Sequence, residues 1–194
     1  MNNGTFQLNK IFLDSHIVTD KYCEQTLKAS WMDTKLGPMI AIADEIGLYL
    51  LEFVDRRGLE RKVERLRLKT KATITPGSTA PIESITLELE SYFEGKLRQF
   101  NTPLHLLGSP FQKLVWKELR SIPYGITRSY ATQATAIGKN TACRAVANAN
   151  GANPLAIILP CHRIINSNGE LGGYGGGIIR KQWLIEHEKR QVYC

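Results

Sequence analysis

The sequence predicts an α+β protein in which a small α/β domain precedes a mainly helical domain. Two short apolar runs, residues 39–43 and 48–53, flank the polar stretch "DEIG" and are typical of a β-hairpin. Segments with apolar residues three or four apart follow the hairpin and predict amphipathic helices. From residue 129 the chain becomes rich in alanine, and a glycine separates two short helical patterns. We therefore expect a strand-containing first half and a helical second half.

Two helices are predicted after the hairpin. Segment 58–69, "GLERKVERLRLK", places three apolar residues on one helix face, and "TITPGSTAP" then breaks the pattern. Segment 82–96 repeats the amphipathic pattern, with Gly95 near its end. The apolar positions are Leu59, Val63 and Leu66 in the first helix, and Ile85, Leu89 and Phe93 in the second.

The sequence pattern changes near residues 101–109, "NTPLHLLGS", and we place a domain boundary there. The expected parts are an N-terminal extension of unknown role (1–30), a small α/β domain (31–105) and a helix-turn-helix domain (106–194). The last of these begins with "PFQKLVWKELRSIPYG", a predicted helix from Pro110 that Pro123 and Gly125 stop. Its expected inward residues are Phe111, Leu114, Val115 and Leu119.

Residues 129–154, "SYATQATAIGKNTACRAVANANGANP", predict a helix-turn-helix. Ser129 is a candidate N-cap for the first helix, Gly138 breaks it, and Asn140 or Thr141 is a candidate N-cap for the second. Arg144 falls near the start of the second helix, where a recognition helix presents side chains to DNA. An ordinary pair of packed helices is the alternative. The expected inward residues are Ala131, Ala134 and Ile137 in the first helix, and Ala142, Ala145, Val146 and Ala149 in the second.

The net charge of +7 favours a nucleic-acid partner, because it is confined to one half of the chain. Residues 1–100 contain 14 Lys and Arg against 14 Asp and Glu, whereas residues 101–194 contain 11 against 4. A basic half beside a neutral half indicates a polyanionic partner.

A final helix is predicted over residues 178–190, "IIRKQWLIEHEKR". We expect it to bury Ile179, Trp183 and His187. The expected solvent-facing residues are Arg180, Lys181 and Lys189.

The composition also predicts a protein that is soluble and cytoplasmic. No run of about 18 apolar residues exists, and the first thirty residues carry charges where a secretory signal needs an apolar core. The four cysteines are widely spaced and form no C-x-x-C pair, so neither a disulfide framework nor a zinc motif is expected. They are Cys23, Cys143, Cys161 and Cys194.

Cys161 is the candidate for chemistry because of its surroundings in "LAIILPCHRIINSNGELGGYGGG". An isolated cysteine is most often an inert core residue. Here His162 and Arg163 stand beside it, and cationic or proton-accepting neighbours lower the pKa of a thiol.

A protease-like pairing of Cys161 with His162 is disfavoured. Adjacent residues do not share a face of a strand or a helix, so His162 would have to act through a water or a turn. A hydrolase would also need an oriented third group, which the sequence does not identify.

The glycine-rich stretch 169–177 does not match a nucleotide-binding motif. It lacks a Walker lysine, and Ile178 stands where G-x-G-x-x-G needs its third glycine. The glycines instead allow close approach to a flat ligand, with Tyr174 as a wall, or form a mobile loop. The histidines and cysteines show no metal-ligand spacing.

The stretches "SYATQATAIGKNTACRAVANANGANP" and "NPLAIILPCHRIINSNGELGGYGGGIIRKQWLIEHE" together resemble the O6-alkylguanine-DNA alkyltransferases. P-C-H-R after an apolar run, R-A-V-A, N-P and a terminal H-E form a highly specific set. The close resemblance covers residues 109–190. It implies a ribonuclease-H-like N-terminal domain and a winged-helix-like C-terminal domain, whereas residues 1–30 lie outside the resemblance.

The resemblance implies a role for each matching position. Cys161 matches the alkyl acceptor, and His162, through a water and with Glu188, keeps it as a thiolate. Tyr130 helps to protonate the departing guanine, and Asn153 is the hinge before the active-site loop. The residues matching the DNA contacts are Arg144, which fills the gap left by the flipped base, Tyr130, Thr141 and Ser167. Those matching the wall of the alkyl pocket are Tyr174, Gly172 and Gly173.

The implied function is repair of O6-alkylguanine in double-stranded DNA by irreversible, one-for-one alkyl transfer to Cys161. O4-alkylthymine is a further candidate substrate. A base in a duplex hides its O6 substituent, so the nucleotide must be flipped out. The resemblance implies a monomer without a cofactor, and the family's human-type metal ligands are not apparent, so no zinc is expected. A non-catalytic damage sensor and a cysteine hydrolase are the alternatives.

Overall fold

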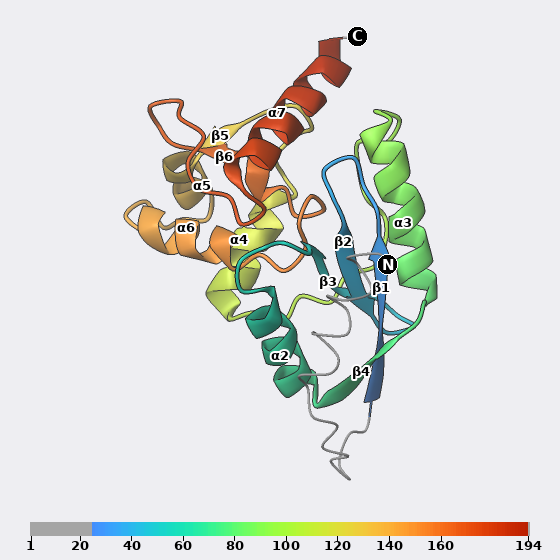
Figure 1. Ribbon diagram of the computed structural model, residues 1–194. Helices are drawn as coiled ribbons and strands as arrows, with labels where there is room; N and C mark the ends of the chain where they lie inside the picture. Colours follow the sequence, from blue (N-terminus) through green and yellow to red (C-terminus); the bar gives the residue numbers. More distant parts are fainter. Residues whose placement is uncertain (1–24, 194) are drawn as a thin grey trace. The chain divides into compact units, whose positions relative to one another are not determined.

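A computed structural model describes residues 25–193 of the chain. These residues form two compact units. The first runs to Leu87 and includes Thr102–His105, and the second comprises Glu88–Asn101 and Leu106 onward. Figure 1 shows a mixed α+β chain, which confirms the predicted fold class.

The first unit contains a four-stranded sheet in the order β3-β2-β1-β4. β2 (Met39–Ala43) and β3 (Leu48–Phe53) pair antiparallel, which confirms the hairpin. β1 (Gln25–Met32) pairs antiparallel with β2 and parallel with β4 (Ala72–Pro76). Neither of these two pairings of β1 was predicted from the sequence. Residues 25–30, assigned above to an extension, therefore belong to β1, while residues 1–24 lie outside the described part.

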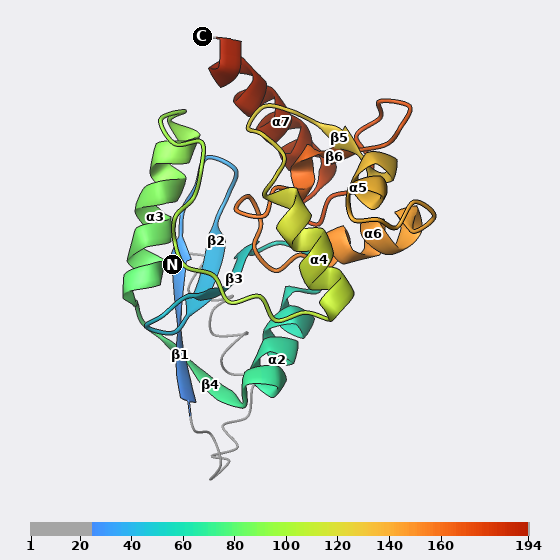
Figure 2. The same ribbon diagram turned by 180° about the vertical axis from the view of Figure 1, so that it is seen from behind.

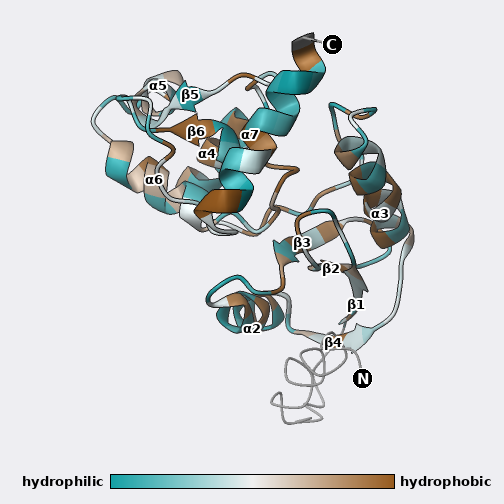
Figure 3. Cartoon of the chain, turned by 45° about the horizontal axis from the view of Figure 1, so that its top comes forward, coloured by the Kyte–Doolittle hydropathy of each residue, from teal (hydrophilic) through white to brown (hydrophobic). Residues whose placement is uncertain are grey.

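The predicted helix after the hairpin is α2 (Leu59–Thr70), and Leu59, Val63 and Leu66 are buried as expected. They pack on alternate residues of the sheet, including Leu27, Ile40, Ile42 and Leu50. Figures 1 and 2 show the first half of α3 (Ala80–Phe93) on the other side of the sheet. In Figure 3 both helices carry hydrophilic and hydrophobic residues, as helices with one buried face do.

The second unit begins with the end of α3, on which Leu89 and Phe93 are buried as predicted. α4 (Pro110–Leu119) then starts with a capping box, because Ser109 and Gln112 each bond the backbone N–H of the other. Two expectations for α4 were wrong. Leu114 is 42% exposed and Phe111 is only half-buried, while Trp116 is buried and donates to the Ala149 carbonyl. The inward face is thus turned toward the second helix of the helix-turn-helix.

The helix-turn-helix consists of α5 (Tyr130–Ala136) and α6 (Cys143–Gly151). Ser129 caps α5 as predicted, its hydroxyl accepting from the Thr132 N–H, and Gly138 takes a φ of 68°. The predicted cap of α6 was wrong, since Ala142 occupies the N-cap position without a side-chain bond. The inward positions were partly right: Ala134, Val146 and Ala149 are buried, Ala131, Ile137 and Ala142 are half-buried, and Ala145 is exposed.

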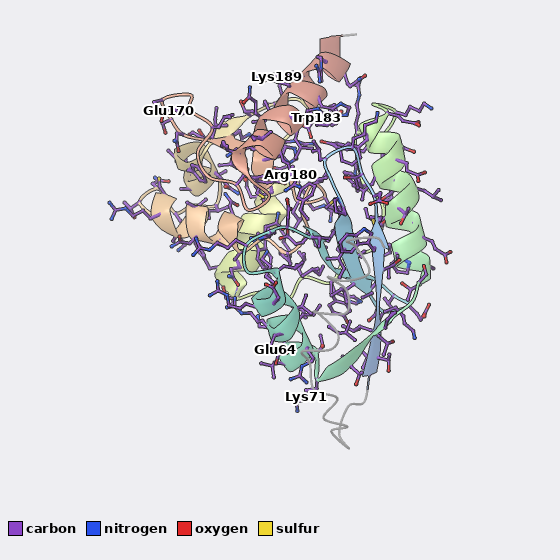
Figure 4. All side chains as sticks on the ribbon, viewed as in Figure 1. Glu64, Lys71, Glu170, Arg180, Trp183 and Lys189 are labelled. Atoms are coloured by element: carbon purple, nitrogen blue, oxygen red, sulfur yellow. The ribbon has the colours of Figure 1, made fainter. Side chains whose placement is uncertain are left out.

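A two-stranded parallel sheet and a long helix complete this unit. β5 (Arg128–Ser129) pairs with β6 (Ile164–Ile165), and the 3₁₀ helix η1 (Cys161–Arg163) directly precedes β6. α7 spans Ile178–Tyr193, and Figure 4 places Arg180 and Trp183 on it.

The orientation expected for α7 was wrong at two positions. Ile179 is 82% exposed, whereas Lys181 is fully buried. His187 is buried as expected, and Trp183 is half-buried with its ring stacked on that of His187. No helix within residues 25–193 is long and apolar enough to cross a membrane.

Candidate active site

Cys161 opens η1 after a buried apolar segment, so its backbone is anchored in the core of the second unit. Its side chain is half-buried. The Asn153 amide Nδ2 donates to Cys161 Sγ at 3.2 Å and to the Leu159 carbonyl at 2.8 Å. Through these two bonds Asn153, which is 2% exposed, links the sulfur to the backbone of the segment that precedes it. Ile157, in the same segment, has a φ of 70°, which is rare for a β-branched residue.

His162 and Glu188 form a buried pair next to this cysteine. His162 Nε2 lies 2.8 Å from Glu188 Oε1. Because an ionised carboxylate only accepts, Nε2 carries the proton and Nδ1 is left as an acceptor. His162 Nδ1 is buried and has no protein partner in the described residues. Burial lowers the pKa of His162 more than Glu188 raises it, so the imidazole is neutral near pH 7.

Glu188 is held by donors from three other segments. Tyr92 Oη donates to Oε1 at 2.8 Å, and the Gly125 N–H donates to Oε2 at 3.1 Å. Arg163 donates through Nε and Nη2 at 2.8 and 2.9 Å. Burial raises the pKa of this carboxyl group, but the bonds and charges of His162 and Arg163 outweigh burial and hold the pKa well below its usual value. The carboxylate is therefore ionised.

Gly125 is required at this point of the network. Its φ is 76°, and a Cβ there would lie 2.6 Å from Val192 Cγ2. Any other residue would be strained and would clash with α7.

Tyr130 and Lys181 lie close enough to Cys161 for its charge to act on both. Burial and the neighbouring Cys161 raise the pKa of the Tyr130 hydroxyl, so it stays protonated. Lys181 Nζ lies 5.9 Å from the centre of the Tyr130 ring and donates to the carbonyls of Ile164 and Gly173. Burial lowers the pKa of Lys181 to about 8 although Cys161 raises it.

Residues from the glycine-rich loop lie against these groups. The Tyr174 ring meets the His162 ring edge to face at 6.4 Å. Gly172 has a φ of 65°, and a Cβ there would lie 3.3 Å from a Tyr130 ring carbon. A Cβ on Gly173 would meet nothing within 4 Å. Gly172 thus permits the close approach to Tyr130, and Gly173 does not need to be glycine for space.

The other predicted residues lie outside this cluster. Arg144 is exposed on the first turn of α6, and Thr141 is exposed just before that helix. Ser167 is exposed in the loop after β6, the loop that carries Glu170 in Figure 4. The structure therefore gathers Cys161, His162 and Glu188 with Tyr130, Asn153 and Tyr174, and leaves the DNA-contact candidates at the surface.

Two residues of the site were missed from sequence. No sequence pattern identified Tyr92 as a site residue, because an aromatic residue on an amphipathic helix is indistinguishable in sequence from an ordinary core residue. Lys181 was assigned to solvent by its charge. Within the described residues, no three His, Cys, Asp or Glu side chains gather as metal ligands.

A helix-turn-helix unit that holds a half-buried cysteine beside a buried pair of a neutral histidine and an ionised carboxylate defines a class: DNA-binding proteins equipped for covalent chemistry at a thiol. Comparison with known proteins identifies the family. Residues 110–190 match the family model "6-O-methylguanine DNA methyltransferase, DNA binding domain", and residues 27–106 match "6-O-methylguanine DNA methyltransferase, ribonuclease-like domain".

Individual relatives agree with these matches. The chain is 56% identical over 161 residues to a methylated-DNA–protein-cysteine methyltransferase of Mycobacterium tuberculosis, covering 83% of this chain and 92% of the relative. A protein of the same name from Methanosarcina barkeri is 38% identical over 162 residues, covering 83% and 96%. The crystal structure of M. tuberculosis OGT in complex with DNA superposes with a TM-score of 0.73 at 40% identity, covering 84% and 94%. The chain belongs to the 6-O-methylguanine DNA methyltransferase family.

Proposed function

We propose that this chain is a methylated-DNA–protein-cysteine methyltransferase that repairs O6-alkylguanine by moving the alkyl group to Cys161. The observation that carries the proposal is the Cys161 sulfur, which accepts from Asn153 beside the buried His162–Glu188 pair. The thiolate sulfur attacks the alkyl carbon, the bond from carbon to O6 breaks, and its electron pair passes to the guanine. Tyr130 supplies the proton that the guanine takes up.

His162 and Glu188 keep the thiol ionised in this proposal. Glu188 fixes the Nε2–H tautomer, so His162 Nδ1 presents a lone pair that accepts the thiol proton through a water. The fully buried, negatively charged carboxylate offsets the charge that the imidazole gains. Asn153 positions the sulfur, and Lys181, as a buried cation, favours the thiolate form.

The product is a thioether, which has no carbonyl for water to attack. The acceptor is therefore not regenerated, and each protein molecule acts once. This distinguishes the reaction from that of a cysteine hydrolase, whose acyl-enzyme is hydrolysed.

A methyl-transfer experiment tests this assignment. Fully reduced protein is incubated with duplex DNA containing O6-methylguanine. The protein is then digested, and the masses of its peptides are measured by mass spectrometry. We expect one methyl group on Cys161, never more than one repaired base per protein molecule, and no adduct in Cys161→Ala.

Cys143→Ala is the matched control, because Cys143 is the other half-buried free cysteine of the described residues. It should retain one methyl group on Cys161. Absence of an adduct in the wild type, or an adduct on Cys143, would contradict the proposal. DNA binding without any adduct would favour a damage sensor, and multiple turnovers on an ester would favour a hydrolase.

DNA binding is assigned to α6 and its surroundings. Arg144 is proposed to fill the gap left by the flipped base, Thr141 and Ser167 to contact the DNA, and Tyr174, Gly172 and Gly173 to wall the alkyl pocket. Minor-groove binding suits this task, because it reads little sequence and a lesion can lie at any guanine.

We expect Arg144→Ala to slow repair of duplex DNA more than dealkylation of free O6-methylguanine base, since only the duplex requires flipping. Single-turnover rates on both substrates measure this. An equal loss on both would argue against a role in base flipping.

We further propose that the protein acts as a monomer in the cytoplasm and accepts O4-alkylthymine as a second substrate. Sedimentation of the free protein tests the monomer, and the mass assay with O4-methylthymine DNA tests the substrate.

A further inference from the structure

A cavity of about 190 Å³ in the second unit is lined by three arginines and by no acidic residue. Arg98 comes from the loop after α3, Arg120 from the C-cap of α4, and Arg163 from η1. None of the residues proposed above to contact DNA or to receive the alkyl group lines this cavity. It is a second basic site within the unit, with its own walls.

Two of the arginines have charge available for a ligand. Arg163 is 7% exposed and bonds Glu188 and the Ile122 carbonyl, so its charge is compensated. Arg98 and Arg120 are exposed and form no ion pair within the described residues. Arg98 donates one N–H to the Gln191 carbonyl, which leaves the rest of its guanidinium group free to donate elsewhere. The cavity therefore carries uncompensated positive charge.

The Tyr124 side chain also lines this cavity. The guanidinium carbons of Arg98 and Arg163 lie 5.8 and 5.6 Å from the centre of its ring. Its hydroxyl oxygen is buried and has no hydrogen-bond partner in the described residues. Burial and the Glu188 charge raise the pKa of Tyr124 to about 12, so the hydroxyl is a neutral donor.

We propose that this cavity binds a phosphate group, with Arg98 and Arg120 pairing with its oxygens. One guanidinium group can donate two parallel hydrogen bonds to two oxygens of a phosphate group. Donors from separate segments suit a tetrahedral anion with several acceptor oxygens. The phosphate comes either from the backbone of bound DNA or from a free phosphate ion, and the two sources are separable by experiment.

Binding of a ligand in the cavity should change the environment of the active-site residues. Ile157 and Pro160 form part of its wall, and Cys161 is the next residue. Arg163 lines the cavity and also bonds Glu188. Amide signals of Tyr124 and Cys161 are therefore suitable reporters.

The first experiment titrates the full-length protein with inorganic phosphate while NMR follows these amides, at an ionic strength held constant with chloride. We expect saturable shifts at Tyr124 and Cys161. Arg98→Ala and Arg120→Ala should each weaken phosphate binding at least about tenfold, since a hydrogen bond to a charged group contributes about 1.5–3 kcal/mol. Lys117→Ala is the matched control, because it removes a charge from the same helix outside the cavity and should leave the affinity unchanged.

The second experiment measures the salt dependence of binding to unmodified duplex DNA. Loss of one phosphate contact reduces the slope of log K against log salt by about 0.9. A reduced slope in Arg98→Ala and Arg120→Ala, but not in Lys117→Ala, identifies a DNA phosphate as the occupant. An unchanged slope with lost phosphate binding identifies a free phosphate.

The proposal is overturned if phosphate neither shifts these signals nor binds, and the slope is also unchanged. Equal effects of Lys117→Ala would overturn it as well, because they would indicate general charge attraction. Arg120→Lys, which retains the charge, guards against misfolding of the alanine variants. Neither experiment uses alkylated DNA, so failure here leaves the proposed methyl transfer untouched.

Discussion

Glu188 receives five hydrogen bonds, more than any other side chain described above, and this fixes its protonation state and its position together. A carboxylate with so many charged and neutral donors keeps its negative charge despite near-complete burial. His162 in turn stays neutral, because burial opposes its protonation. In the resting protein the imidazole is therefore neutral and available to accept the thiol proton, and the ionised carboxylate is in place to offset the positive charge that the imidazole then gains.

Tyr92→Phe tests one donor of this network. The variant loses the hydroxyl that donates to Glu188 Oε1 and should reduce the free energy of unfolding by about 1.5–3 kcal/mol, the contribution of a hydrogen bond to a charged group. Urea denaturation measures the loss.

The matched control is Tyr49→Phe, which removes a hydroxyl that donates to Asp44 in the partly exposed part of the first unit. It should cost less, because water can replace that donor. The single-turnover rate of methyl transfer should fall in Tyr92→Phe and stay unchanged in Tyr49→Phe. An unchanged rate in both would mean that Tyr92 is only structural.

Lys181 predicts a pH dependence of stability. Burial lowers its pKa in the folded state to about 8, below the usual value of a lysine. As pH rises from about 8 to the ordinary lysine pKa of about 10.4, the folded state has released this proton while the unfolded state still binds it. The contribution of Lys181 to stability therefore rises with pH in this window.

Comparison of wild type with Lys181→Met, whose side chain has similar length and no charge, isolates this contribution. The difference in unfolding free energy, wild type minus variant, should increase across the window. A difference independent of pH would show that the lysine pKa is not lowered.

At the scale of the element, patterns with a clear period were predicted and mixed patterns were not. The hairpin and α2 follow a simple apolar pattern, and the structure has them where the sequence places them. β1 and β4 carry threonine, lysine and proline among their apolar residues, so alternation is weak. They are strands because neighbouring strands supply backbone partners that a local pattern cannot reveal. For α7, Ile179 was wrongly expected to face inward, and Lys181 is instead held inward by its hydrogen bonds to the carbonyls of Ile164 and Gly173.

Within the helix-turn-helix, a buried polar pair joins the two helices. Asn150 Nδ2 donates to Gln133 Oε1 at 2.7 Å, and Gln133 Nε2 donates to the Val115 carbonyl on α4. Both side chains are buried. The pair therefore links α4, α5 and α6 where an apolar contact would fix orientation less specifically.

A double-mutant cycle tests this link. Asn150→Leu leaves Gln133 Oε1 buried without its donor and should cost about 1–3 kcal/mol. Adding Gln133→Leu removes the stranded group, so the double variant should be more stable than the sum of the single changes predicts, by about 0.5–3 kcal/mol. Chemical denaturation measures all four proteins, and strict additivity would show that the two side chains do not interact.

At the scale of the molecule, charge and chemistry coincide in one compact unit. The second half of the chain carries the whole net charge and contains Cys161 and the helix-turn-helix. The second unit, which also includes Arg98, holds the basic cavity as well. The proposed acceptor, its proposed supporting residues and the DNA-contact candidates could be named from sequence, because they stand in short motifs. Tyr92 and the arginine-lined cavity could not, since residues distant in sequence meet there only through folding.

The convergence on Glu188 has a consequence for the chain while it folds. Its donors come from three segments, α3, η1 and the turn at Gly125, so the carboxylate on α7 acquires its full set only when all four parts are assembled. A partly folded molecule has a cysteine but lacks the arrangement that activates it. In the proposed reaction, methylation of Cys161 therefore reports the fraction of molecules that are correctly assembled.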